Sequence, residues 1–169
     1  MKPRWDHKED AMMLAYRLVR LIETHSDKLA DRLLLKIQAS DKTSLFHNVP
    51  REDFRTAVFE IYTHLGQWLL GKSEADIARR YTEIGKRRSF QGVPLSQLMW
   101  AIVLTRSNLW EYLKQEETLE RPAEIFGELE MLELLEEFFD RAIYWAAVGY
   151  EQETAELRKQ GKTVAMSSR

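Results

Sequence analysis

The fold class is decided by a stretch near the middle of the chain, PLSQLMWAIVLTRSNLWEYLKQ, which spans residues 94–115. Its apolar residues recur at spacings of three and four, which is the period of an α-helix, and they cover much of the helix circumference. These positions are Leu95, Leu98, Met99, Ile102, Leu109 and Leu113. A helix that is apolar on most sides has to be surrounded by other elements. We therefore expect residues 94–115 to form the central helix of a packed core.

The same helical period continues on both sides of this stretch, and no alternating run of strand length interrupts it. The chain has 169 residues with only four prolines and seven glycines, most of which fall where helix boundaries are expected. The pattern predicts an all-α bundle of about six helices. They cover residues 6–24, a second helix capped by Ser26, residues 50–71, a fourth opened by a Ser73–Asp76 capping box, residues 94–115 and residues 122–160, with a polar loop at 40–48.

The last predicted helix is longer than one domain needs. No break occurs between Pro122 and Gly161, and at a rise of about 1.5 Å per residue this helix reaches on the order of 55 Å. We expect its end to protrude or to pair with another element. The sequence thus predicts a single helical domain over residues 1–160, followed by a flexible tail or linker stub over 161–169.

Composition excludes several classes of function. Lysine and arginine number 25 against 27 acidic residues, for a net charge of −2, so neither nucleic acid nor an anionic membrane is the expected partner. The absence of cysteine removes disulfides, thiolate metal sites and thiol nucleophiles. The longest apolar run, residues 98–104, is far shorter than the roughly 20 residues of a membrane span. The charged first ten residues do not resemble an export signal, and we expect a cytoplasmic protein.

Catalytic motifs are missing as well. The sequence contains no nucleophile elbow, phosphate-binding loop or dinucleotide fingerprint. An acidic run over residues 128–140 lacks the Glu-x-x-His spacing of helical metal sites, and its spacing favours a solvated helix face. We expect no enzyme, no catalytic residue, no metal and no cofactor. A small helical enzyme is the third hypothesis, and the absence of a paired base and nucleophile counts against it.

One motif contains more than the glycine and proline residues expected at helix boundaries. It reads G-x-x-R-x-x-x-G-x-P-L and is followed by an apolar helix that contains R-x-x-x-W. Its members are Gly85, Arg88, Gly92, Pro94, Leu95, Arg106 and Trp110. Local structure alone also accounts for much of it, because Gly92 permits a positive φ, Pro94 suits a first helical turn and Arg88 suits a helix end.

This motif resembles the N-terminal domain of RsbT co-antagonist proteins, the RsbR and RsbRD type that precedes STAS domains and occurs in some sensor kinases. The resemblance extends from about residue 14 to residue 150. It implies a globin-like helical sensory domain that usually lacks haem, dimerises and passes a signal along its last helix to an output domain or a downstream signalling protein. The sequence ends shortly after that helix, so we expect either an excised sensory domain or a stand-alone adaptor that docks to another protein.

Haem is the alternative cofactor for such a fold, since its iron needs an axial ligand such as histidine. His64, near the edge of an apolar stripe, and His25, at the junction of the first two helices, are the two candidates. A lone helical histidine is more often packed or exposed than a ligand, so a haem-free domain is the first hypothesis. A haem-binding gas sensor is the second.

The last predicted helix also carries more aromatic surface than one buried stripe requires. The residues concerned are Phe138, Ile143, Tyr144 and Trp145. A second apolar face on a helix is typical of an interface. We expect these residues to contact a second copy of the chain, so that the protein is a homodimer.

Overall fold

The computed structural model describes the backbone of residues 6–116 and 122–167, and the side chains of Met13 and of residues 16–115 and 129–161. Within these ranges the chain is all-α, as predicted. Its elements, in order, are α1 (Asp6–Thr24), α2 (Ser26–Ala39), the 3-10 segment η1 (Asp41–Asn48), α3 (Arg51–Thr63), the π-helical turn η2 (Gln67–Gly71), α4 (Glu74–Phe90), α5 (Leu95–Glu116) and α6 (Pro122–Ser167).

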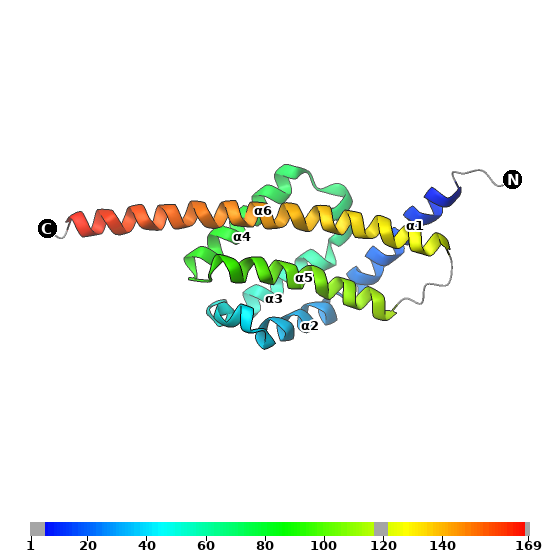
Figure 1. The fold of residues 1–169 in the computed structure, drawn as a ribbon, viewed down its shortest axis with the longest axis horizontal. Helices are drawn as coiled ribbons and strands as arrows, with labels where there is room; N and C mark the ends of the chain where they lie inside the picture. The colour runs from blue at the N-terminus through cyan, green and yellow to red at the C-terminus, as the bar shows by residue number, and fades with distance from the viewer. Residues whose placement is uncertain (1–5, 117–121, 168–169) are drawn as a thin grey trace.

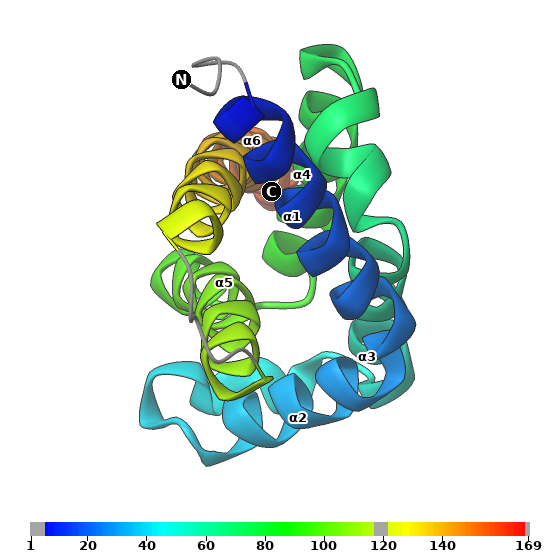
Figure 2. The same cartoon turned by 90° about the vertical axis from the view of Figure 1, so that its right-hand side faces the viewer.

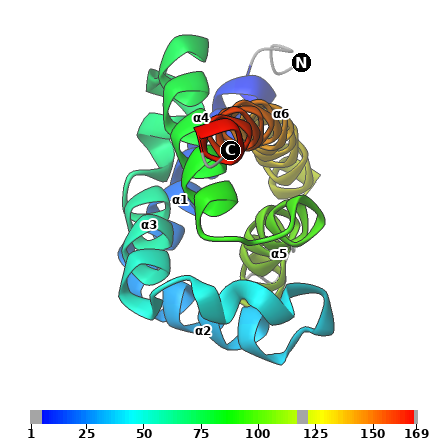
Figure 3. The same cartoon turned by 90° about the vertical axis from the view of Figure 1, so that its left-hand side faces the viewer.

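The long helix α6 organises the bundle. It runs the length of the molecule in Figure 1, with α5 antiparallel to it and α4 behind it. Its most extensive packing is against α4, followed by α1 and α5. In views along the axis of α6, the helices α1, α3 and α4 lie on one side and α5 lies on the other (Figures 2 and 3). Helix α2 lies at the side of the bundle opposite α6. This arrangement fits the globin-like fold that the resemblance implies.

The core fills the space between these helices with apolar side chains from every element. Leu109 and Leu113 of α5 are fully buried, as are Leu29 of α2 and Leu65 before η2. A polar network lies among them: the Tyr62 hydroxyl donates to the Thr105 carbonyl at 3.0 Å and accepts from the Asn108 amide at 3.3 Å. These bonds satisfy polar groups that would otherwise be costly to bury.

Several helix boundaries follow from local chemistry. Ser73 and Asp76 form the predicted capping box, with the Ser73 hydroxyl accepting from the Asp76 N–H and the Asp76 carboxylate accepting from the Ser73 N–H. Gly92 has φ of 74°, a conformation that favours glycine, and it separates α4 from α5 as predicted.

Four local predictions are wrong. Ser26 is the first residue of α2 rather than its cap, and its hydroxyl accepts from Thr63. The predicted loop at 40–48 contains the 3-10 segment η1. The predicted helix over 50–71 ends at Thr63, because the chain turns at His64 and continues as η2. Helix α6 does not end at Gly161, since a glycine in a helix costs only about 1 kcal/mol, and it continues to Ser167.

Candidate functional site

Helices α4 and α6 cross with their backbones in close contact. A Cβ atom added to Gly85 of α4 would lie 2.0 Å from the carbonyl oxygen of Ala146 in α6. A Cβ added to Gly149 of α6 would likewise lie 2.0 Å from the carbonyl oxygen of Thr82 in α4. Any larger residue at either position would force the helices apart. Gly85, which the motif singled out, is therefore required for the crossing.

The end of α4 next to this crossing is fixed by a Schellman motif. The Val93 N–H donates to the Arg88 carbonyl at 3.1 Å, and the Gly92 N–H donates to the Ser89 carbonyl at 3.0 Å. Val93 is fully buried and anchors the turn. The Pro94 carbonyl then accepts from the Leu98 N–H and starts α5. The Gly-x-Pro part of the motif thus fixes the end of α4, from whose last turn Arg88 projects.

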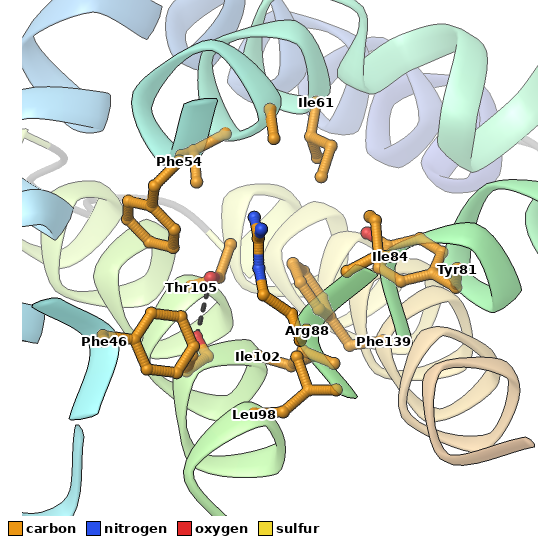
Figure 4. Close-up of a pocket in the computed structure, with 13 residues that line it drawn as sticks. Phe46, Phe54, Ile61, Tyr81, Ile84, Arg88, Leu98, Ile102, Thr105 and Phe139 are labelled. Atoms are coloured by element: carbon orange, nitrogen blue, oxygen red, sulfur yellow. Dashed lines mark hydrogen bonds between the residues drawn. The ribbon is translucent and has the colours of Figure 1, made fainter. Parts of the chain in front are cut away.

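Arg88 points into a cavity between η1, α3, α4, α5 and α6, which we call the Arg88 cavity (Figure 4). The space inside it is about 480 Å³ when the part open to solvent is included, of which the centre of a water molecule reaches about 50 Å³. Besides Arg88, its walls are largely apolar. They consist of Phe46, Phe54, Ala57, Val58, Ile61, Tyr81, Ile84, Leu98, Ala101, Ile102, Thr105 and Phe139.

The guanidinium of Arg88 is buried and, among the described residues, has no ion-paired carboxylate. The residue is only 4% exposed. Its Nη1 donates to the Gln91 side-chain oxygen at 2.7 Å, and no carboxylate among the described residues forms an ion pair with it. Burial, together with the neighbouring charge of Arg87, lowers the pKa of Arg88 to about 10, and the Asp53 carboxylate offsets part of this effect. The group therefore carries a positive charge into an apolar space at neutral pH.

Two other polar groups face this cavity. The Tyr81 hydroxyl is turned toward it in Figure 4, and burial raises the pKa of this phenol, so the group stays neutral. Thr105 donates its hydroxyl proton to the Ala101 carbonyl at 2.8 Å, which leaves the Thr105 oxygen as an acceptor only. The cavity therefore offers one cation and one neutral hydroxyl to a bound molecule.

The cavity is connected to α6 at several points. Phe139 of α6 forms part of its wall. Next to the Schellman turn, the Tyr150 hydroxyl donates to the Val93 carbonyl at 2.7 Å. One turn further along α6, the Thr154 hydroxyl lies 3.0 Å from that of Ser89. A displacement of the end of α4 would therefore act directly on α6.

The remaining motif residues serve packing. The Arg106 guanidinium of α5 lies 3.8 Å from the Asp140 carboxylate of α6, a loose and partly exposed ion pair. Trp110 is half-buried against the core. The structure thus places Gly85, Arg88, Gly92 and Pro94 around one helix end, whereas Arg106 and Trp110 lie on the next helix and do not line the Arg88 cavity.

The histidines considered for haem lie elsewhere. His64 is exposed at the end of α3. His25 is half-buried at the α1–α2 kink, where its Nδ1 donates to the Leu21 carbonyl at 2.9 Å and its ring lies 5.8 Å from that of Tyr112. Neither residue lines the Arg88 cavity. The residues around this cavity therefore do not fit a haem with a histidine ligand.

The predicted interface is only partly available to a partner. Placing Phe138 on it is wrong: its side chain is 2% exposed and packs on Tyr81 and Phe139 in the core. Ile143 and Trp145 are half-buried against the core, and the Trp145 indole donates to Glu74 at 2.7 Å. Tyr144 is 60% exposed and stays a candidate for contact with a second copy.

Two features of the site were missed in the sequence. Gly149 was not singled out, although an isolated glycine within a long helical pattern is a signal for close packing. The burial of Arg88 had no sequence signal, because its neighbours Arg87 and Lys86 have the same character and are not buried.

The structure is an all-α bundle whose long last helix forms part of the wall of a small, largely apolar cavity. No helix in the described parts of the chain combines the length and apolarity needed to cross a membrane. The chain belongs to the family of the RsbT co-antagonist protein rsbRD N-terminal domain, whose model matches residues 27–164. The resemblance drawn from the motif is thereby confirmed, and the chain is a stressosome-type signalling regulator. No curated protein and no solved structure matches it.

Proposed function

We propose that this chain is a haem-free, non-enzymatic regulatory domain that dimerises and relays a signal through α6 to a downstream signalling protein or output domain. The observation that carries the proposal is the position of α6. This one helix contributes Phe139 to the Arg88 cavity, crosses α4 at Gly149 and then projects beyond the other elements (Figure 1). A change at the cavity can therefore reach the far end of the same rigid element.

The relay can be tested in the projecting part of α6. Ala155 is exposed, and the chain has no native cysteine, so Ala155→Cys provides a single site for a spin label. We expect Tyr150→Phe, which removes the hydrogen bond to the Val93 carbonyl, to increase the mobility of this label. A label at Leu35→Cys on α2, 62% exposed, serves as the control and should not respond. Identical spectra at position 155 in both backgrounds would argue against the relay.

Dimerisation is supported by exposed apolar side chains on α6. Tyr144 is 60% exposed and Leu129 is 50% exposed. Large apolar residues of this kind on one element favour association, since burying them removes apolar surface from water. Light scattering should give about twice the mass of the chain. Tyr144→Glu should yield a monomer, and the matched Leu35→Glu should not. A dimer that is unchanged by Tyr144→Glu would exclude this interface.

The haem-free state is supported by the positions of His25 and His64, neither of which faces the Arg88 cavity. An absorption spectrum of the freshly purified protein tests it, and we expect no Soret band. A Soret band that is lost in His64→Ala or His25→Ala would support the haem-sensor alternative instead. The non-enzymatic assignment is supported by the groups at the cavity, because one guanidinium and two hydroxyls do not form a nucleophile–base pair.

A further inference from the structure

Arg88 differs from the partly exposed arginines of the bundle. Arg32, Arg55 and Arg80 each pair with an acidic side chain of another helix, at 2.7–2.9 Å. Arg88 is more buried than these three, and the partner of its side chain among the described residues is the neutral Gln91 oxygen. Burying a cation without an anion opposes folding. Groups that oppose folding in this way are concentrated where they serve binding.

We propose that the Arg88 cavity binds a compact organic monocarboxylate, with the ligand carboxylate paired to the Arg88 guanidinium and its apolar body against the cavity wall. A carboxylate matches the planar guanidinium and can accept two hydrogen bonds from it. The Tyr81 hydroxyl, from the same helix as Arg88, also faces the cavity (Figure 4) and can donate a hydrogen bond to the bound anion. The ligand thus supplies the ion-pairing carboxylate that Arg88 lacks among the described residues.

The cavity selects against other anions by charge and polarity. It contains one cation, so a doubly charged phosphate would bring an unpaired negative charge into an apolar space. Apart from Arg88, Tyr81 and Thr105, its lining side chains have no polar atoms. An inorganic anion with acceptors on all sides would leave several of them without donors. A single carboxylate at one end of an apolar molecule avoids both penalties.

The size of the cavity limits the apolar body. About 480 Å³ of space, part of it open to solvent, lies between Phe46, Phe54, Ile61, Leu98 and Phe139. The centre of a water molecule reaches only about 50 Å³ of it, which is room for about three to five water molecules at about 10–15 Å³ each. Branched or aromatic acids such as 4-methylpentanoate and benzoate suit this space, whereas long-chain acids would have to extend through its open side.

Binding at this point would act on the helix end that touches α6. The Arg88 carbonyl accepts from Val93 in the Schellman turn, and the Val93 carbonyl accepts from Tyr150 of α6. The idea that the carboxylate acts as a signal rests on the proposed relay function. The binding of the carboxylate to the Arg88 cavity does not depend on that function.

Isothermal titration calorimetry with benzoate and 4-methylpentanoate tests the site directly. Benzyl alcohol serves as the neutral control of similar shape, and inorganic phosphate as the polar anion. We expect saturable binding of the carboxylates, with at least tenfold weaker binding or none for both controls. Equal binding of benzyl alcohol and benzoate, or no binding of either carboxylate, would overturn the proposal.

Two variants separate binding from folding. Arg88→Met removes the positive charge but retains a long side chain, and it should weaken carboxylate binding at least tenfold. Arg87→Met, at an exposed neighbouring position, should leave carboxylate binding unchanged. Without ligand, the midpoint temperature of Arg88→Met should equal or exceed that of the wild type by a few degrees, since an unpaired buried charge is removed. A clear fall in that temperature together with unchanged carboxylate binding would assign Arg88 a structural role and refute the site.

The spin label at Ala155→Cys distinguishes this inference from the proposed function. A change in label mobility on adding benzoate, absent in Arg88→Met, would support both. Calorimetric binding without any change at position 155 would support the carboxylate site and refute the relay. Failure of binding refutes the site, and the Tyr150→Phe comparison still decides the relay independently.

Discussion

The α4–α6 crossing gives the sharpest prediction about stability. We consider Gly85→Ala and Gly149→Ala, which each add one methyl group. At either position the new Cβ would lie 2.0 Å from a backbone carbonyl oxygen, whereas ordinary contact begins at 3.4 Å. The helices must therefore separate locally by about 1.4 Å, because the obstacle is backbone and cannot rotate away.

The energetic cost follows from this displacement. Overpacking a well-packed interior typically costs about 1–3 kcal/mol, and a gap of even 0.5–1 Å removes roughly a quarter to a half of the dispersion attraction of the contacts involved. Since α4–α6 is the most extensive helix contact of the bundle, we expect each variant to lose about 3 kcal/mol. At about 2–4 °C per kcal/mol for a chain of this size, the midpoint of thermal unfolding should fall by about 6–12 °C.

Two other glycines provide matched controls. A Cβ at Gly71 or Gly161 meets no atom within 4 Å, and neither residue has a positive φ. Gly161→Ala lies within α6 and should leave stability unchanged or raise it by up to about 1 kcal/mol. Urea denaturation followed by circular dichroism measures all four variants. If Gly85→Ala lies within about 0.5 kcal/mol of the wild type, the close crossing is refuted.

Two further predictions concern a helix cap and the buried network. Hydrogen bonds from Ser73 lower the pKa of Asp76. A carboxyl group whose pKa is lower in the folded state stabilises the protein above its unfolded pKa, and this contribution is lost as the pH falls through the folded pKa. Ser73→Ala removes the hydroxyl but keeps the backbone N–H, which has the larger effect on the Asp76 pKa. The variant should cost about 0.5–2 kcal/mol at neutral pH through loss of the cap and reduce the acid-induced loss only in part; an acid-induced loss larger than in the wild type would contradict this. Tyr62→Phe should cost about 1–3 kcal/mol by leaving the Asn108 amide without this acceptor, while the exposed Tyr144→Phe should stay within about 0.5 kcal/mol by the same denaturation assay.

The sequence determined the features that depend on neighbours along the chain. The helical period of residues 94–115 established the fold class, and the Ser73–Asp76 box and Gly92 set the ends of α4, because capping bonds and a positive φ are local properties. Pro50 and Gly71 likewise bounded a helical segment, although the break at His64 within it was missed. The family that the G-x-x-R-x-x-x-G-x-P-L motif and the following R-x-x-x-W helix indicated is confirmed by a match over residues 27–164.

Only the tertiary structure decided which side chains are buried and which residues from distant parts of the chain come into contact. Phe138 and Tyr144 lie on the same helix and have similar side chains, yet one is in the core and the other is 60% exposed, because α4 covers only one face of α6. Gly85 and Gly149 are far apart in sequence and become partners only at the helix crossing. Arg88 has the same sequence character as Arg87, but only its direction from the last turn of α4 takes it into the cavity. Burial, close approach and charge pairing are properties of elements in contact, and the local sequence does not contain them.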